Sequence, residues 1–271
     1  GAGRVYNCNT NGGIVTGDGM AMAFRHGVPL RDMEFVQYHP TGLPGTGILM
    51  TEGCRGEGGI MLNKNGYRYL QDYGMGPETP IGQPKNKYME LGPRDKVSQA
   101  FWHEMQKGNT IKHPLGDVVH LDLRHLGKEY LHERLPFICE LAKAYVNVDP
   151  AEEPIPIRPT VHYTMGGIET DKNNETRISG LFAVGECSSV GLHGANRLGS
   201  NSLAELVVFG RLAGEGAAKR AAEFKGWNEE SIAKQVQAVQ DRIDTLLSQD
   251  GDENWADIRT EMGHSMEAGC G

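Results

Sequence analysis

Two histidines and three arginines stand in turns bounded by glycine and other small residues, where a backbone can close around a ligand. They are His39 in "QYHPTG", His162 in "PTVHYTMGG", Arg55 in "MTEGCRGEGG", Arg94 in "LGPRDKVS" and Arg197 in "GLHGANRLGSNSL". Taken singly, each has an ordinary explanation as a loop histidine or a solvated charge. Taken together they predict a pocket for a small dianion, because a guanidinium group recognises a carboxylate through a planar fork of donors. A dicarboxylate is the ligand that this set favours.

Other residues suggest a cofactor site. Asp18 and Glu186 each follow a glycine at the boundary of an element, where a carboxylate can accept hydrogen bonds from ribose or ribityl hydroxyls. Residues 181–184 are predicted to form a short buried strand, followed by a glycine-rich turn and a long helix, a pattern that holds a phosphate or cofactor at the helix N-terminus. Ser202 and Glu205 match a capping box for that helix. The sequence has no complete GxGxxG fingerprint.

Helices and strands in mixed order must position these residues. Pro93 suits a first helical turn and apolar residues recur at helical spacing up to residue 105, so Arg94 is predicted to lie at a helix N-terminus. The pattern indicates α/β segments interrupted by an α+β region, with a helical bundle beginning at the end of the chain. The other expected elements are a helix from Asp18 to Gly27, a strand over 33–40, a loop over 76–88, a helix over 131–146 with Pro136 near its start or at a kink, and amphipathic helices over 232–246 and 255–262.

Composition limits the class of protein. The 271 residues carry a formal net charge of −8 with 38% hydrophobic residues, which is typical of a soluble globular chain and argues against nucleic acid as a partner. No apolar run approaches the roughly 20 residues that span a bilayer, so membrane association is expected only through partner subunits. Five scattered cysteines without a CxxC pair predict neither disulfides nor a metal site, and fit a reducing cytosolic compartment. Because the chain starts without methionine, we expect an internal piece of a longer protein.

Four long motifs carry a family resemblance: "QYHPTGLPGTGILMTEGCRGEGG", "LGPRDKVSQAFW", "RPTVHYTMGGIETD" and "GLFAVGECSSVGLHGANRLGSNSLAELVVFG". They closely resemble the flavoprotein subunits of bacterial fumarate reductase and succinate dehydrogenase, and the resemblance covers the whole chain. It implies reversible reduction of fumarate to succinate, by hydride transfer from N5 of FAD and proton donation from an arginine. The domains it implies are part of an FAD-binding domain (1–32), a capping domain (33–158), a return to the FAD-binding domain (159–220) and the start of a helical domain (221–271).

The same resemblance implies a role for individual residues. Those that match the dicarboxylate site are His39, Thr51, His162 and Arg197, and His39 also belongs to the catalytic group. Those that match the proton pathway are Arg94 as the donor, with Glu52 and Arg55 as the relay that returns the proton. Those that match FAD contacts are Asp18, Tyr163, Glu186, Ser202 and Leu203. The histidine to which the family attaches FAD covalently lies outside this chain.

The resemblance also implies an assembly. Its members work with an iron–sulfur subunit and membrane anchor subunits at the cytoplasmic face of the bacterial inner membrane. Two alternatives stay open. One is an L-aspartate oxidase-like flavoenzyme, which shares the histidine, arginine and "SNSL" motifs. The other is a folded, non-catalytic fragment that lacks half of the FAD site.

Overall fold

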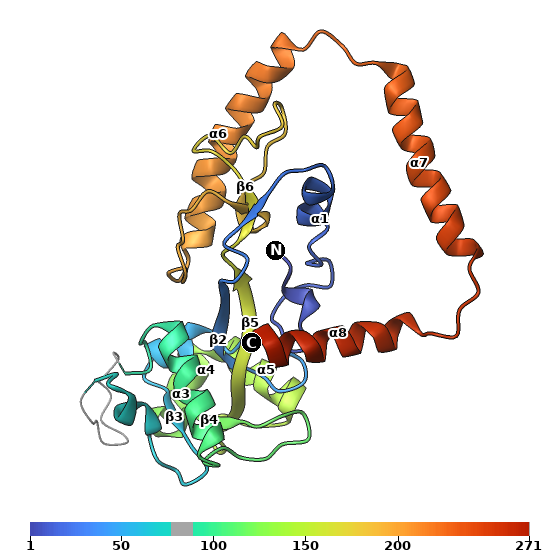
Figure 1. Cartoon of the computed structure of the whole chain (residues 1–271). Coiled ribbons are helices and arrows are strands. Elements are labelled where there is room, and N and C mark those ends of the chain that lie inside the picture. Colours follow the sequence, from blue (N-terminus) through green and yellow to red (C-terminus); the bar gives the residue numbers. More distant parts are fainter. Residues whose placement is uncertain (77–88, 271) are drawn as a thin grey trace.

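The computed structural model describes residues 1–76 and 89–270, so the loop expected over 76–88 lies outside the described residues except for its first position. Helices and strands are mixed along the chain (Figure 1), which confirms the predicted fold class. Within the described ranges, no helix combines the length and apolarity that crossing a bilayer requires.

A four-stranded antiparallel sheet carries most of the residues of interest. Its strands, in spatial order, are β2 (Val36–Gly42), β5 (Ile155–Thr164), β4 (Val119–Asp122) and β3 (Ile60–Leu62). His39 of β2 lies opposite Thr160 of β5, and Gln37 lies opposite Tyr163. Gln37 and His39 are buried whereas Tyr38 between them is partly exposed, as the alternation of strand side chains requires. The predicted strand over 33–40 is confirmed, with a start three residues later.

Helices cover this sheet and enclose the larger of two hydrophobic cores. The helix predicted after Pro93 is confirmed as α3 (Arg94–Gln106), which contacts β2 and places Arg94 in its first turn. The short helix α2 (Glu52–Gly56) begins in the glycine-rich turn that follows β2. The core includes Leu43, Met50, Met61, Tyr69, Leu70, Val97, Leu121, Leu131, Ile155 and Ile157. Short 3-10 helices span Gly3–Val5, Tyr69–Tyr73, Arg124–Leu126 and Gly185–Cys187.

The single helix expected over 131–146 is two helices, α4 (Lys128–Arg134) and α5 (Pro136–Val146). The chain leaves helical geometry at Leu135, whose φ is −133°, and Pro136 takes the first position of α5. Proline is favoured there because a first-turn residue needs no N–H partner and its fixed φ suits the helix. The break therefore follows from the proline that the sequence pattern had placed near a start or a kink.

A smaller sheet and α1 (Asp18–Arg25) enclose the second core. The strands, in spatial order, are β1 (Leu30–Arg31), β6 (Gly167–Glu169) and β7 (Ser188–Ser189), with β6 parallel to β7. A Cβ atom on Gly166 would lie 2.3 Å from the carbonyl oxygen of Asp32, so only glycine lets the chain pass into β6. The core residues are Met20, Ala23, Val28, Ile168 and Ala183. The helix predicted from Asp18 to Gly27 is confirmed as α1.

The strand predicted over 181–184 is wrong. Phe182 forms one isolated bridge to Glu175, and the regular pairing starts only at β7. Leu181 is exposed, so this apolar run does not lie inside a sheet. A run of four apolar residues has no periodicity that separates a strand from an irregular segment.

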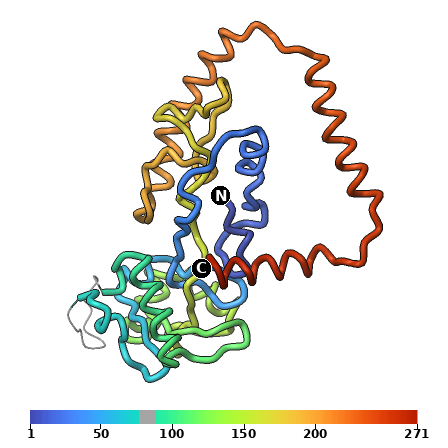
Figure 2. Tube along the Cα trace, viewed as in Figure 1, coloured from blue at the N-terminus to red at the C-terminus, as the bar shows by residue number. Residues whose placement is uncertain are grey.

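Three helices end the chain: α6 (Asn201–Glu223), α7 (Glu229–Ser248) and α8 (Trp255–Cys270). Figure 2 shows them as an open triangle in which α8 returns to the N-terminal segment. There the Glu267 carboxylate accepts a hydrogen bond from the Cys8 N–H at 2.6 Å. The predicted helices are confirmed. The apolar stripe of α7 is exposed, with Val236 at 63%, so these helices do not pack into a closed bundle within the described residues.

Candidate functional site

His39 is a buried side chain of the candidate site with one donor that has no partner among the described residues. The side chain is fully buried on β2. Its Nδ1 accepts a hydrogen bond from the Thr41 N–H at 3.3 Å, so the neutral ring carries its proton on Nε2. That Nε2 atom is buried without a hydrogen-bond partner among the described residues. Because an unmet buried donor costs free energy, His39 is suited to a ligand oxygen.

His162 lies beside His39 on the neighbouring strand β5. The two ring centroids are 5.3 Å apart and meet edge to face. The His162 Nδ1 shares a hydrogen bond of 2.7 Å with the Thr10 hydroxyl, which fixes the ring from the N-terminal segment. Residues from three distant parts of the sequence therefore hold the two histidines in one place.

Arg94 and Arg197 meet at the side chain of Gln37. The Gln37 Oε1 accepts a hydrogen bond from Arg94 Nη1 at 3.0 Å and another from Arg197 Nη2 at 3.2 Å. The Gln37 Nε2 donates to the Asn196 side chain and to the Arg197 carbonyl oxygen, both at 2.6 Å. Two like charges are thus held close together by one amide group. Arg197 is buried, and its Nε atom has no partner in the described part of the chain.

Glu52 lies between Arg94 and Arg55. Its Oε2 accepts a hydrogen bond from Arg94 Nη2 at 2.8 Å and lies 3.9 Å from Arg55 Nη2. Arg55 is 1% exposed, and its Nη1 donates to the carbonyl oxygen of Glu90. Its Nε and Nη2 have no hydrogen-bond partner among the described residues. The carboxylate of Glu52 is therefore hydrogen-bonded to one guanidinium group and forms a longer ion pair with the other.

Burial and neighbouring charges determine which side chains of the site are charged at pH 7. Burial and the charges of Arg55 and Arg94 hold the pKa of His39 well below its usual range. Burial and the arginine charges lower the pKa of His162 to about 4, so both histidines are neutral at pH 7. Burial alone would raise the pKa of Glu52, but the hydrogen bond from Arg94 and the charge of Arg55 lower it. Three guanidinium groups and one carboxylate leave two positive charges, which complement a dianion.

Arg55 and Arg197 also respond to their surroundings. Burial lowers the pKa of Arg55, and it lowers that of Arg197 together with the charge of Arg94. The guanidinium carbon of Arg197 lies 4.2 Å above the ring centroid of Tyr163, a cation–π contact. These arginines are held at a cost in desolvation that a bound anion would offset.

Thr51 stands at the edge of the cluster formed by His39, His162, Arg55, Arg94, Arg197 and Glu52. It is the N-cap residue of α2, where its hydroxyl accepts a hydrogen bond from the Gly53 N–H at 3.4 Å. Its side chain is exposed, and no hydrogen bond between Thr51 and the two histidines is present in the described residues. Thr51 therefore borders the cluster through its neighbour Glu52.

The residues expected to contact a cofactor fall into two groups. Tyr163 and Glu186 lie next to the cluster, with Glu186 accepting a hydrogen bond from the Thr164 N–H at 3.0 Å. Ser202 and Leu203 lie in the first turn of α6, a few residues after Arg197. Asp18 lies apart in the first turn of α1, where it accepts from the Thr16 hydroxyl at 2.6 Å.

The predicted capping box at the start of α6 is wrong. The N-cap residue is Ser200, with φ of 63° and no capping bond from its side chain. Glu205 is 3% exposed and instead accepts hydrogen bonds from the Tyr163 hydroxyl at 3.1 Å and from His193 at 2.7 Å. Ser202 lies inside the first turn and not at the cap, and Glu205 serves two buried donors, which would cost free energy if left without an acceptor.

Sequence reasoning missed several residues of this site. Gln37, which joins Arg94 and Arg197, was covered only by the predicted strand over 33–40. Its position two residues before His39 was the available signal, since strand residues at that spacing share a face. Thr10 and Glu205 had no such signal, because their partners are distant in sequence.

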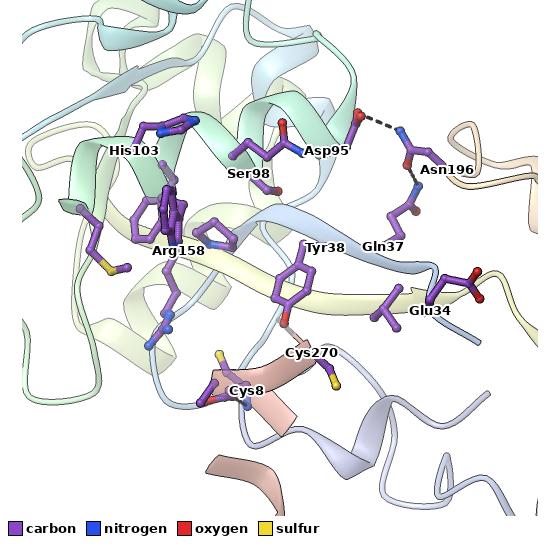
Figure 3. A pocket seen from close by; sticks show the side chains of 18 of the residues that line it. Cys8, Glu34, Gln37, Tyr38, Asp95, Ser98, His103, Arg158, Asn196 and Cys270 are labelled. Carbon is purple, nitrogen blue, oxygen red and sulfur yellow. Dashed lines mark hydrogen bonds between the residues drawn. The ribbon is translucent and has the colours of Figure 1, made fainter. Parts of the chain in front are cut away.

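A cavity of about 720 Å³ lies on the other side of β2 (Figure 3). Tyr38, which alternates with the buried residues of β2, lines it together with Trp102 of α3 and Cys270 of α8. The cavity is therefore separate from the cluster of charged side chains, and Gln37 is the residue that the two have in common. At its edge, Asn196 donates to the Asp95 carboxylate at 2.9 Å, which ties the loop of Arg197 to α3.

Comparison with known proteins identifies the family to which this chain belongs. The family model described as "FAD binding domain" matches residues 1–203, and the chain belongs to this FAD-binding family. The chain is 80% identical over 271 residues to the fumarate reductase flavoprotein subunit of Escherichia coli (strain K12), covering 100% of this chain and 45% of that protein. This confirms the resemblance carried by the four motifs.

Two further relatives agree. A solved quinol-fumarate reductase with menaquinol molecules superposes with a TM-score of 0.96 at 80% identity, covering 100% of this chain and 47% of that chain. The succinate dehydrogenase flavoprotein subunit of Rickettsia bellii (strain RML369-C) is 44% identical over 282 residues, covering 99% of this chain and 44% of that protein. The chain thus spans less than half the length of these relatives.

The residues present fit the FAD that the family match indicates as cofactor. At the start of α6, Leu198, Leu203 and Val207 are 72%, 66% and 74% exposed. This apolar surface follows directly on the buried Arg197, and an apolar face beside hydrogen-bonding groups suits a flat heteroaromatic ring. The N-terminus of a long helix also favours negative charge on a bound group.

Proposed function

We propose that this chain forms the dicarboxylate side of the active site in a fumarate reductase flavoprotein subunit, which reduces fumarate to succinate reversibly. The observation that carries the proposal is the convergence of Arg94 and Arg197 on Gln37, beside a neutral His39 whose Nε2–H has no partner among the described residues. Two net positive charges and an unmet donor match a small dicarboxylate in charge and hydrogen bonding.

The residues of the chain divide the work of reduction. Arg197, His39 and His162 bind the two carboxylates of fumarate, and Thr51 closes the edge of the site. FAD, when bound, supplies the hydride that goes to one alkene carbon. The other alkene carbon takes a proton, and the electron pair of the double bond forms the new C–H bond.

Arg94 is the proposed source of that proton. It is a poor acid, because free guanidinium has a pKa above about 12, so its neutral form must be short-lived. Glu52, at 2.8 Å, passes a proton back to Arg94, and Arg55 supplies Glu52 through one bridging water or after its Nη2, 3.9 Å away, moves within hydrogen-bond distance. Burial lowers the pKa of Arg55, which makes it a better proton source than an exposed arginine.

The proposed cofactor contacts are Tyr163, Glu186, Ser202, Leu203 and Asp18. Four of them lie near Arg197 or at the start of α6, which supports the assignment. Asp18 rests only on the family resemblance and on its place after a glycine. The division into residues 1–32 with 159–220, 33–158 and 221–271 is likewise proposed, and the two separate hydrophobic cores support it.

The proposed partners are an iron–sulfur subunit and membrane anchor subunits, with the flavoprotein at the cytoplasmic face of the bacterial inner membrane. Support comes from a relative of known structure, a quinol-fumarate reductase with menaquinol. The absence of a membrane-crossing helix from the described residues is compatible with attachment through such subunits.

Substitution of Arg94 tests the proposed reaction in the full-length flavoprotein. The variant Arg94→Gln keeps a donor but cannot give up a proton, so fumarate reduction should fall by at least about 100-fold while FAD is retained. The control is Lys96→Gln, which removes a positive charge from an exposed position two residues along the same helix. Turnover by Arg94→Gln equal to that of the control would remove Arg94 from the reaction.

Two assays separate the alternatives. Hydrogen peroxide formed from L-aspartate by the full-length protein, without a membrane partner, would favour an L-aspartate oxidase-like enzyme. The flavin absorbance of the purified 271-residue chain tests whether this part binds FAD by itself. If no flavin co-purifies with it while the full-length protein is yellow, the chain alone is a non-catalytic fragment.

A further inference from the structure

A buried ion pair lies behind the catalytic arginines. Glu90 and Arg68 are 1% and 8% exposed. The guanidinium of Arg68 holds the Glu90 carboxylate through two parallel hydrogen bonds, from Nε to Oε1 at 2.7 Å and from Nη2 to Oε2. The Met61 N–H of β3 donates to Oε1 at 3.4 Å. Glu90 is thereby fixed to the sheet by its side chain.

The backbone of Glu90 connects this pair to Arg55. Its carbonyl oxygen accepts a hydrogen bond from Arg55 Nη1. This hydrogen bond orients the Arg55 guanidinium, since the other two nitrogen atoms of that group, Nε and Nη2, have no hydrogen-bond partner in the described residues. The direction in which Arg55 presents its Nη2 to Glu52 therefore depends on where Glu90 lies.

The same residue sets the start of α3. Only three residues separate Glu90 from Arg94, and one of them, Pro93, is the N-cap residue of the helix with φ of −52°. A turn closes this link, with the Gly92 N–H donating to the Met89 carbonyl at 3.3 Å. A short link with a turn and a proline has few conformations, so displacement of Glu90 is passed on to Arg94.

We propose that Arg68 and Glu90 are positioning residues for proton delivery: their buried pair holds Arg55 through the Glu90 carbonyl and Arg94 through the start of α3, on either side of Glu52. This rests on the proposed function, in which Arg55, Glu52 and Arg94 pass a proton to the substrate. Neither Arg68 nor Glu90 touches the substrate in this arrangement.

The geometry of the pair makes arginine necessary at position 68. A bidentate pair fixes the carboxylate in plane and in direction, whereas a lysine gives one point charge on a flexible stem. Arg68→Lys therefore keeps the charge balance but releases the orientation of Glu90. Because proton transfer depends steeply on donor–acceptor distance, a shift of less than 1 Å at Arg55 or Arg94 is enough to slow it.

The test compares Arg68→Lys with a matched control in the full-length flavoprotein. The control is Arg124→Lys, since Arg124 holds Asp122 through an equivalent pair of hydrogen bonds at 3.0 and 2.7 Å. For Arg68→Lys we expect kcat for fumarate reduction to fall about 10-fold to 100-fold, with KM within about twofold and FAD retained. The solvent deuterium isotope effect on kcat should increase, because proton delivery becomes rate-limiting.

A second variant and the wild-type assay keep the outcomes distinct. Glu90→Gln keeps the size of the side chain and removes the bidentate pair, and it should show the same loss of kcat and the same larger isotope effect. A purely structural role would lower the active fraction without changing the isotope effect, and that result would overturn the proposal. So would a kcat for Arg68→Lys equal to that of Arg124→Lys. If the wild-type protein does not reduce fumarate, the proposed function itself fails.

Discussion

The variant Gln37→Glu places a negative charge between two arginines without changing the size of the side chain. The Gln37 Oε1 lies 3.0 Å from Arg94 Nη1 and 3.2 Å from Arg197 Nη2, so a carboxylate there forms ion pairs with both. The two hydrogen bonds from the arginines are kept and strengthened, whereas the two that Gln37 Nε2 donates, to the Asn196 side chain and the Arg197 carbonyl oxygen, are lost, so some stability is lost as well. Ligand binding should be weakened directly, since the new charge repels the dianion that the site is proposed to bind.

The size of the effect follows from Coulomb's law. A substrate carboxylate on the far edge of the Arg197 guanidinium would lie roughly 6 Å from the new charge, and at an effective dielectric constant of about 20 the repulsion is about 3 kcal/mol. Dicarboxylate affinity should therefore fall by about 100-fold. The second carboxylate of the ligand adds to this loss, and the neutralised site attracts the dianion less.

The measurement is the dissociation constant for succinate, from flavin absorbance changes in the full-length flavoprotein. Gln106→Glu is the control, since Gln106 is exposed at the other end of α3. Thermal unfolding of both variants shows whether the fold is kept. An unchanged succinate affinity in folded Gln37→Glu would refute the assignment of Arg94 and Arg197 to carboxylate binding.

Three further predictions concern stability and reactivity. Burial lowers the pKa of His162 to about 4, so between pH 4 and 6.5 the unfolded chain binds a proton that the folded protein does not. The free energy of unfolding should therefore fall by about 3 kcal/mol as the pH drops from 7 to 4. In urea titrations, His162→Gln should reduce this dependence of the unfolding free energy on pH. Glu205→Ala leaves the Tyr163 hydroxyl and the His193 ring N–H without an acceptor. It should lower the free energy of unfolding by about 2–4 kcal/mol in the same assay. Burial raises the pKa of Cys54 to about 12, so iodoacetamide at pH 8 should modify the exposed Cys270 and leave Cys54 intact, as peptide mass spectrometry would show.

Much of the fold was predictable because its elements carry local signals. Apolar spacing with proline at one end and glycine at the other marks α3, and the same spacing marks the long C-terminal helices. The break at Leu135 was less certain from sequence, since a proline inside an apolar stripe is compatible with one kinked helix or two helices. The false strand over 181–184 shows the opposite case, in which four apolar residues carry no periodicity to test.

The sequence predicted which charged residues belong to the candidate site, but it could not predict the contacts between their side chains. Arginines and histidines in glycine-bounded turns point to an anion site wherever those turns meet. The role of Gln37 could not be predicted from sequence, because it depends on hydrogen bonds from two arginines that lie 57 and 160 residues away. Glu205 was misread for the same reason: its partner Tyr163 is 42 residues away, and that buried contact overrides the local S-x-x-E pattern.

The charge distribution explains why an arginine, and no histidine, would deliver the proton under the proposed function. Binding a dianion requires several guanidinium groups close together, and their field with burial keeps His39 and His162 neutral at pH 7. A neutral histidine can direct a hydrogen bond to a carboxylate but has no extra proton to give. In such a field only a group as basic as guanidinium stays protonated, so the arrangement that binds the substrate also restricts the choice of acid to Arg94 and its relay. Arg68 and Glu90 then matter because a weak acid can compensate for its low acidity only by exact placement.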